Sequence, residues 1–184
     1  MPKRLPGHGR GLPSCCGHRR VRIPSPERLN HVYGPGRTFG GSTEGVTSAM
    51  CRKALEAIER GDHEIEIWGD GTQRRAFTFI TDAVEGIERV MRLETPDPVM
   101  ISCRESTTIN QLVDRIEEID GVRFQRRCVS DDGAVFPHHD LDHDAAEKAL
   151  GWEPQVKIAV GIRKTYEWIR DQACSSSEPA RDDK

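Results

Sequence analysis

The sequence predicts an α/β protein, in which short strands alternate along the chain with amphipathic helices. Ile65 and Ile67 alternate with glutamates, which is the period of a strand with one buried face. Apolar residues recur at three- and four-residue spacing over 46–60, which is the period of a helix. A run of aromatic and β-branched residues over 77–80 is typical of a second strand.

The composition is that of a globular protein with a small core. Of 184 residues, 35% are hydrophobic and 31% are charged, and no apolar run reaches the length that spans a membrane. Residues 27–184 carry a formal net charge of −9, since all the charged residues before them are basic. This acidic body argues against nucleic acid as the main partner. Six scattered cysteines without a C-x-x-C pair indicate reduced thiols and a cytoplasmic protein.

The two ends of the chain are expected to be disordered. Residues 1–26 are rich in Gly, Pro, Arg and His and lack a hydrophobic period. Three interpretations remain open for them: an organelle transit segment, a basic tail for anionic partners, or a wrongly joined start of the reading frame. The abrupt start of folded-protein composition near Glu27 favours the third. Residues 173–184 are rich in serine and charge and are predicted to form a tail.

The folded part begins with a strand, a loop and a helix. Residues 28–35 are typical of the end of a strand that runs into a Gly-Pro turn, and a glycine-rich loop follows through Gly45. The helix predicted over 46–60 ends at Gly61. Lys53 lies off its apolar stripe, so its ammonium is available to solvent or to a phosphate.

The stretch 64–82 is the strongest candidate for a functional site. Gly69-Asp70-Gly71 gives the chain the backbone freedom to turn between two strands. The turn leaves Gln73, Arg74 and Arg75 at the mouth of the second strand. Guanidinium groups match phosphate oxygens, and an amide both donates to and accepts from a sugar or a base. We therefore predict a phosphate-bearing ligand here, against the alternative of a solvated, charged turn.

A helix follows this stretch directly. Asp82 and Glu85 have the spacing of an N-terminal cap, and the helix is expected to end before Pro96. Its buried face is predicted to comprise Ala83, Val84, Ile87, Val90 and Met91.

The remaining elements are short. A strand over 99–101 precedes a helix that begins at a Thr108/Gln111 capping box and ends at Gly121. An edge strand is predicted over 122–129, with exposed arginines, and a polar loop over 131–144. Two helices over 145–150 and 158–172 complete the chain, the first closed by Gly151.

Five sequence motifs in a fixed order resemble one protein family. They are R-L-N-H-V-Y-G-P-G (28–36), C-R-K-A-L (51–55), I-W-G-D-G-T-Q-R-R-A-F-T-F-I-T-D-A-V-E-G-I (67–87), L-G-W-E-P (150–154) and K-T-Y-E-W-I (164–169). Over residues 27–172 they resemble the C-terminal half of the extended short-chain dehydrogenase/reductases, the NAD-dependent sugar-nucleotide epimerase/dehydratase family. Within it, the second and third motifs are most similar to the GDP-mannose 3,5-epimerase subfamily.

The resemblance implies a fold and a ligand. The fold is the last strands of a Rossmann-type, NAD(P)-binding sheet with a small C-terminal substrate-binding lobe. The implied ligand is a nucleotide sugar of the GDP-mannose class, held by the region that carries Lys53, Gln73 and Arg75, with Arg75 at the motif's arginine position. Arg74, which stands where relatives vary, and His31, which lies at the end of a strand where ligand sites gather, are further candidates for ligand contact. The family's enzymes are isomerases or lyases that use bound NAD for transient hydride transfer, and the full-length enzyme is implied to be a homodimer.

The sequence also departs from the family pattern. It contains no G-x-x-G-x-x-G after a strand and no Tyr-x-x-x-Lys, because Tyr33 and Tyr166 are each followed by an arginine four residues later. We therefore expect a truncated, catalytically inert chain without catalytic residues. The alternatives are a non-catalytic nucleotide-sugar-binding half-protein and an unstable gene fragment.

Three further positions differ within the matched motifs. The subfamily's loop lysine, an acid/base residue, falls on Gly45, and the family's usual asparagine before the Tyr-Gly-Pro turn is His31. A structural role for His31 is the alternative to ligand contact. Pro137-His138-His139 stands near the place of a phosphate-binding arginine. Histidines and aspartates over 138–144 suggest a metal, but Pro137 and the polar composition favour a loop, so we predict no metal site.

Overall fold

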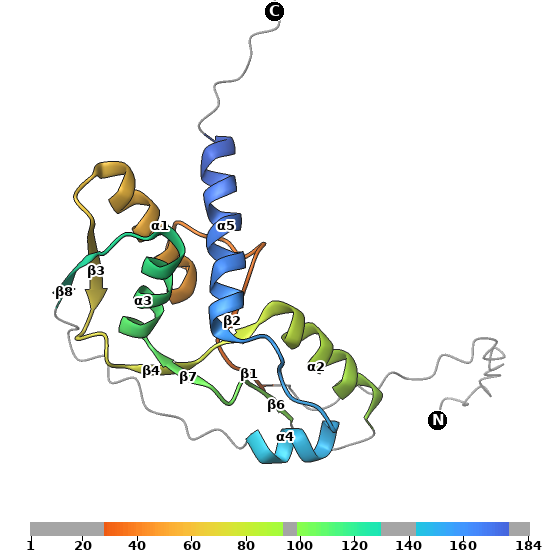
Figure 1. Cartoon of the computed structure of the whole chain (residues 1–184). Helices are drawn as coiled ribbons and strands as arrows, with labels where there is room; N and C mark the ends of the chain where they lie inside the picture. Colours follow the sequence, from red (N-terminus) through yellow and green to blue (C-terminus); the bar gives the residue numbers. More distant parts are fainter. Residues whose placement is uncertain (1–27, 94–98, 130–142, 177–184) are drawn as a thin grey trace, which may run out of the picture.

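Helices alternate with short strands over residues 28–93, 99–129 and 143–176, the part of the chain that this computed structural model describes (Figure 1). This alternation agrees with the predicted α/β class. The elements are β1 (Arg28–Leu29), β2 (Val32–Tyr33), α1 (Val46–Arg60), β3 (Glu64–Trp68), β4 (Arg74–Ala76), β5 (Thr78–Phe79), α2 (Ile80–Arg92), β6 (Met100–Ile101), β7 (Ser106–Thr108), α3 (Ile109–Asp120), β8 (Gln125–Val129), α4 (His143–Leu150) and α5 (Ile158–Ser176).

The described strands form four separate pairs. β1 pairs with β6, β2 with β5 and β3 with β8, all in parallel, whereas β4 and β7 are antiparallel. The β3–β8 pair is the longest, with a register from Glu64↔Gln125 to Trp68↔Val129. Parallel strands are typical of sheets that helices cover, as in doubly wound folds.

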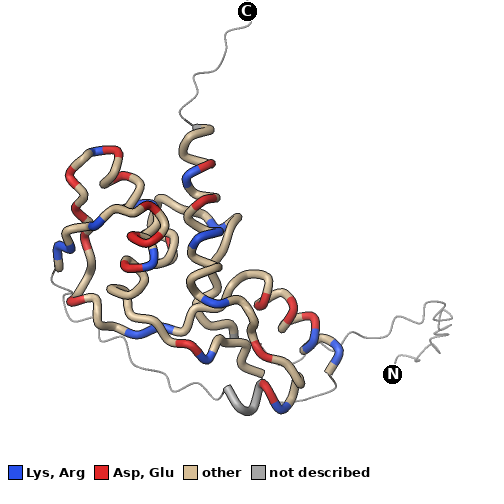
Figure 2. Tube along the Cα trace, viewed as in Figure 1, with Lys and Arg blue, Asp and Glu red and all other residues tan. Residues whose placement is uncertain are grey.

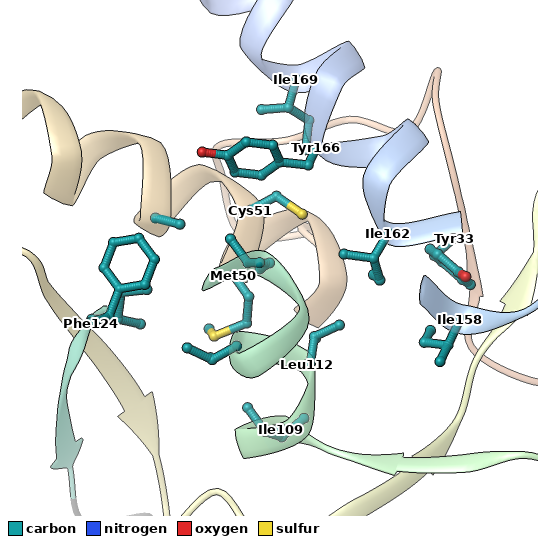
Figure 3. Close-up of a cluster of buried hydrophobic side chains, with 14 of the residues drawn as sticks. Tyr33, Met50, Cys51, Ile109, Leu112, Phe124, Ile158, Ile162, Tyr166 and Ile169 are labelled. Carbon is teal, nitrogen blue, oxygen red and sulfur yellow. The ribbon is translucent and has the colours of Figure 1, made fainter. Parts of the chain in front are cut away.

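The main hydrophobic core lies where α5 packs on α1 and α3 (Figure 3). The face of α1 carries Cys51, Ala54 and Ala57, which are fully buried and small enough for α5 to approach closely. Ile162 and Tyr166 of α5 are fully buried against this face. A second, smaller cluster joins α2 to β6 through Val90, Val99 and Ile101.

Two helices agree closely with the sequence prediction. α1 has the predicted bounds, and Gly61 follows it in a left-handed conformation with φ 73°. α3 begins with the predicted capping box, since Thr108 accepts a hydrogen bond from the Gln111 amide and the Gln111 side chain accepts one from the Thr108 amide. Signals of this kind act within a few residues, and at these two helices no tertiary contact among the described residues competes with them.

The prediction for α2 was wrong in two respects. The helix begins at Ile80, and Asp82 does not cap it; its carboxylate instead accepts a 2.8 Å hydrogen bond from the Val156 amide. Val84 and Met91, predicted to be buried, are 56% and 61% exposed. The run over 77–80 is accordingly divided between β5 and the first residue of α2.

The last helix is also longer than predicted. α5 continues to Ser176, so residues 173–176 are helical and do not belong to a tail. The predicted disorder of residues 1–26 lies outside the described residues. So do most of the predicted loop over 131–144 and the segment Pro137-His138-His139.

Gly161 allows α5 to pack directly on Tyr33. A Cβ at position 161 would overlap the Tyr33 hydroxyl and lie 2.8 Å from Cζ of the ring. We expect Gly161→Ala to lower the free energy of unfolding by about 1 to 3 kcal/mol, because overpacking outweighs the better helix propensity of alanine. Urea denaturation followed by circular dichroism measures the change.

Tyr33→Phe is the matched variant for this contact. The Tyr33 hydroxyl is buried and has no hydrogen-bond partner among the described residues, so its removal should cost little. In the double variant it should recover part of the Gly161→Ala loss. Equal losses with and without the hydroxyl would contradict a direct clash.

Glu117 makes the stability of α3 depend on pH. It is 5% exposed, and it accepts hydrogen bonds from the Phe124 amide (3.0 Å) and from Arg123 (2.6 Å). Desolvation raises the pKa of Glu117, but these hydrogen bonds and the charge of Arg126 outweigh it and lower the pKa overall. The carboxylate therefore stabilises the fold above its unfolded pKa of about 4.3, and this contribution is lost as the pH falls through the lowered value.

We expect Glu117→Gln to lower the free energy of unfolding at pH 7 by about 1 to 3 kcal/mol and to flatten its decline below pH 4.3. Urea denaturation at a series of pH values measures both. Glu118→Gln is the control, since Glu118 pairs with Arg115 only at the exposed surface. An identical acid profile for wild type and Glu117→Gln would contradict the assignment.

Candidate functional site

The turn between β3 and β4 is held by contacts from α3. Asp70 accepts hydrogen bonds from the Thr72 amide (2.9 Å) and hydroxyl (2.7 Å), which closes the turn on itself. The Asn110 side chain donates to the Asp70 carbonyl at 3.0 Å, and the Asn110 amide donates to the Gly71 carbonyl at 3.0 Å. A Cβ at Gly71 would lie 2.5 Å from the Asn110 side chain. Asn110 therefore fixes this turn, a role that no local sequence signal indicated.

Gln73 is turned inward, toward the end of β3. Its amide nitrogen donates to the Trp68 carbonyl at 2.6 Å, and its Oε1 is buried without a hydrogen-bond partner in the described structure. Gly69 leaves room for this side chain, because a Cβ there would lie 2.8 Å from the Gln73 nitrogen. Gln73 thus supports the backbone of the turn, and its contact with a ligand remains a prediction.

The two adjacent arginines do not form a joint pair. Arg74 and Arg75 are consecutive in β4, so their side chains leave opposite faces of the strand. Arg74 extends to β7, where it donates to the Ser106 hydroxyl and carbonyl at 3.0 Å each. Arg75 is half-buried and donates to the Arg74 carbonyl at 2.9 Å. The expected double-arginine mouth is therefore divided between two faces.

Lys53 lies beside β3. Its ammonium donates to the Glu66 carbonyl at 3.0 Å and lies 3.7 Å from the Glu66 carboxylate. This contact ties α1 to β3, so the ammonium is not left to solvent as the sequence suggested. Its contact with a phosphate remains a prediction.

His31 lies near Arg75, at the carboxyl end of β1. It adopts a left-handed conformation with φ 35°, and its carbonyl accepts a hydrogen bond from the Thr78 amide at 3.2 Å. Its ring is 5.9 Å from the Phe77 ring. Desolvation lowers the pKa of His31, and the charges of Arg75 and Arg37 lower it further. The imidazole is therefore neutral at pH 7 and has both a donor and an acceptor.

Arg37 belongs to the same corner, although no sequence signal indicated it as a site residue. Its guanidinium donates to the Val32 carbonyl at 2.8 Å and lies against Gly45, just before α1. The loop that carries Arg37 is anchored by Phe39, whose ring meets Trp168 of α5 edge to face at 5.5 Å. Arg37 was missed because its partners are brought near only by the fold.

Neither described tyrosine candidate is placed to act as a base. Tyr33 is 2% exposed, and burial raises the pKa of its hydroxyl. The Tyr166 hydroxyl donates to Asp120, and burial together with this contact raises its pKa. Both hydroxyls therefore stay protonated at neutral pH.

Other features of the described residues add no further chemistry to the corner. They contain no cluster of three or more metal-ligating side chains, and none of their helices has the length and apolarity needed to cross a membrane. Cys51, Cys103 and Cys128 are free thiols. Acidic and basic residues are interspersed along the described elements (Figure 2).

The arrangement of His31, Arg37 and Arg75, which we call the cationic corner, is suited to holding an anion. The two guanidinium groups stay charged at any physiological pH and present donors in a planar fork. The neutral imidazole adds one donor and one acceptor. Such a set binds and orients oxyanions, but the arginines do not transfer protons.

Comparison with known proteins gives relatives of one kind. The chain is 32% identical over 145 residues to GDP-mannose 3,5-epimerase of Arabidopsis thaliana, a match that covers 79% of this chain and 37% of the relative. It is 27% identical over 148 residues to GDP-L-fucose synthase 1 of the same plant, covering 79% of this chain and 45% of the relative. The chain thus spans less than half the length of these curated relatives.

Solved structures share the fold. The structure of UDP-glucose 4-epimerase from Thermotoga maritima with UDP-glucose matches with a TM-score of 0.66 at 28% identity, covering 79% of this chain and 45% of that one. UDP-glucuronic acid 4-epimerase from Bacillus cereus, in complex with UDP-glucuronic acid and NAD, matches with a TM-score of 0.65 at 23% identity, covering 79% and 44%. The predicted partial Rossmann-type α/β fold is therefore confirmed.

The family assignment made from the motifs is confirmed in the same way. Residues 27–102, which carry β1 to β6 and the cationic corner, match the NAD dependent epimerase/dehydratase family. By this match, residues 27–102 are a segment of the NAD dependent epimerase/dehydratase family, and the similarity to GDP-mannose 3,5-epimerase extends over 79% of the chain.

Proposed function

We propose that this chain is the substrate-binding part of a nucleotide-sugar epimerase/dehydratase, of the GDP-mannose 3,5-epimerase type. Its ligand is a nucleotide sugar of the GDP-mannose class. The observation that carries the proposal is that His31, at the carboxyl end of β1, contacts Phe77 and Thr78, which follow Arg75 in the chain, within the segment that matches the family. Ligand sites of open α/β sheets gather at the carboxyl ends of strands.

The roles of the five predicted residues differ in this proposal. Arg75 holds a phosphate through its guanidinium, and His31 hydrogen-bonds to the sugar. Lys53, Gln73 and Arg74 act mainly through the backbone, because their polar atoms already bind Glu66, Trp68 and Ser106. In contacting a ligand, each of these three side chains would share its donors with these protein contacts.

NAD is implied by the family, and two of its chemical needs can be compared with this chain. A dinucleotide pyrophosphate is held by a tight glycine-rich turn between a strand and the first amides of a helix. In the described residues, α2 and α3 follow β5 and β7 without an intervening glycine. At the start of α3, the Gln111 amide is already hydrogen-bonded to the Thr108 side chain. The glycine-rich segment before α1 is a long loop, and Arg37 covers its last glycine. These residues do not fit the pyrophosphate.

The 184 residues by themselves are proposed to bind without turnover. Hydride transfer needs the dinucleotide, for which the described residues offer no cradle. Tyr33 and Tyr166 are both held in the protonated form. The described residues' lack of a dinucleotide cradle therefore favours the second candidate function, a non-catalytic nucleotide-sugar-binding half-protein. We place this function in the cytoplasm, with homodimerisation in a full-length enzyme.

Arg75→Ala is expected to weaken binding of GDP-mannose by about 10- to 100-fold, because a charge-assisted contact with a phosphate is lost. Isothermal titration calorimetry on the full chain measures the affinity. Arg163→Ala is the matched control, an exposed arginine on α5 outside the cationic corner, and it should bind as wild type does. Unchanged binding after Arg75→Ala would count against the site.

Incubation of the purified chain with GDP-mannose and NAD is expected to give no sugar product, because neither a pyrophosphate cradle nor an available tyrosine base is present among the described residues. Chromatography of the sugar nucleotide measures the product. Turnover would refute the non-catalytic assignment. A chain that binds no sugar and shows no cooperative thermal transition would instead support the gene-fragment alternative.

A further inference from the structure

Gly45 is a glycine for reasons of space. Its backbone has φ −78° and ψ 151°, an extended conformation that any residue adopts. A Cβ at this position, however, would lie 2.8 Å from Nε and 2.9 Å from Cζ of Arg37. The guanidinium thus fills the space where a side chain at position 45 would begin.

This position has chemical meaning in the subfamily that the chain resembles. The resemblance, aligned without gaps, places the subfamily's acid/base lysine at position 45. In this chain the guanidinium of Arg37, eight residues earlier in the loop, occupies the same place. A lysine ammonium can release its proton when its pKa is lowered, but a guanidinium stays protonated. Arg37 therefore keeps a positive charge at this place, but it cannot transfer a proton as a lysine could.

The loop holds Arg37 in place. Phe39 is anchored on Trp168 of α5, and Glu44 accepts a hydrogen bond from the Gly40 amide at 2.9 Å. Among the described residues, the only hydrogen bond that Arg37 makes is the one to the Val32 carbonyl. The remaining donors of its planar fork face no protein acceptor in that part of the structure.

The nearest acid in the loop does not neutralise this corner. Glu44 receives hydrogen bonds from Arg52 at 2.8 and 3.0 Å, which pair its carboxylate with a different arginine. Desolvation raises the pKa of Glu44, but the hydrogen bonds from Arg52 and Gly40 outweigh it and lower the pKa overall. The charge of Arg37 therefore adds to that of Arg75 beside the neutral His31.

We propose that Arg37, in the space left by Gly45, forms an oxyanion-binding subsite in place of an acid/base residue. It binds an anionic group of the nucleotide sugar, which is either a diphosphate oxygen or a carboxylate on the sugar, as in a uronic acid. This inference rests on the proposed function, because the subsite adjoins Arg75. The subsite adds to the proposed function a preference for nucleotide sugars that place a charged oxygen beside Arg37.

The test compares GDP-mannose with GDP-mannuronic acid, which differ only in the carboxylate on the sugar, by titration calorimetry of the full chain. Arg37→Gln removes the charge, and Arg163→Gln is the control. If the subsite takes the carboxylate, wild type binds GDP-mannuronic acid about 10-fold more tightly, and Arg37→Gln abolishes that preference. If it takes the diphosphate, Arg37→Gln weakens both ligands by about 10-fold.

Gly45→Ala tests the geometry independently of the charge. The added methyl must displace the guanidinium, so it should reproduce the losses of Arg37→Gln while the net charge of the chain is unchanged. Both variants should keep the wild-type circular dichroism spectrum. Affinities within about twofold of wild type in both variants, while GDP-mannose still needs Arg75, would overturn the subsite and leave the proposed function intact. No binding of either sugar to wild type would overturn both.

Discussion

The packing of α5 against α1 and α3 is the interaction on which the rest of the structure depends. Two of the three parallel strand pairs contain only two residues per strand, and such short pairs are marginal by themselves. The apolar face of α5, from Ile158 to Ile169, supplies the missing burial for β2–β5, and the small residues of α1 let it approach, whereas β1–β6 is buried against α2. Without α5, β2 and the loop that follows it would lose the surface on which they rest.

The same packing places the cationic corner. Gly161 admits Tyr33 against α5, which sets β2, and Trp168 holds Phe39, which sets the loop with Arg37. On the other side, Asn110 of α3 fixes the turn that leads into β4 and so to Arg75. The corner is therefore assembled from three segments, each held by a different helix contact, and its charges are concentrated before any ligand arrives.

Similarity to the family does not transfer the family's chemistry to these residues. The chain spans 37% of a GDP-mannose 3,5-epimerase, and the matched segment carries contacts suited to a ligand. Arg74 and Lys53, two of the predicted ligand contacts, hold β7 and β3 through hydrogen bonds to main-chain carbonyls. Their structural contacts show that a motif match indicates the architecture more directly than it indicates ligand contacts.

The sequence by itself determined the α/β class, the family, the bounds of α1 and the capping box of α3, because periodicity and caps act over a few neighbouring residues. It predicted Arg75 as a site residue through the motif, and His31 through its position at the end of a strand. Tertiary structure alone decided that Val84 and Met91 of α2 face outward, and that Asp82 binds Val156. It alone brought Arg37 onto Gly45. Contacts of this kind join residues that no local pattern relates, so only the packed chain reveals them.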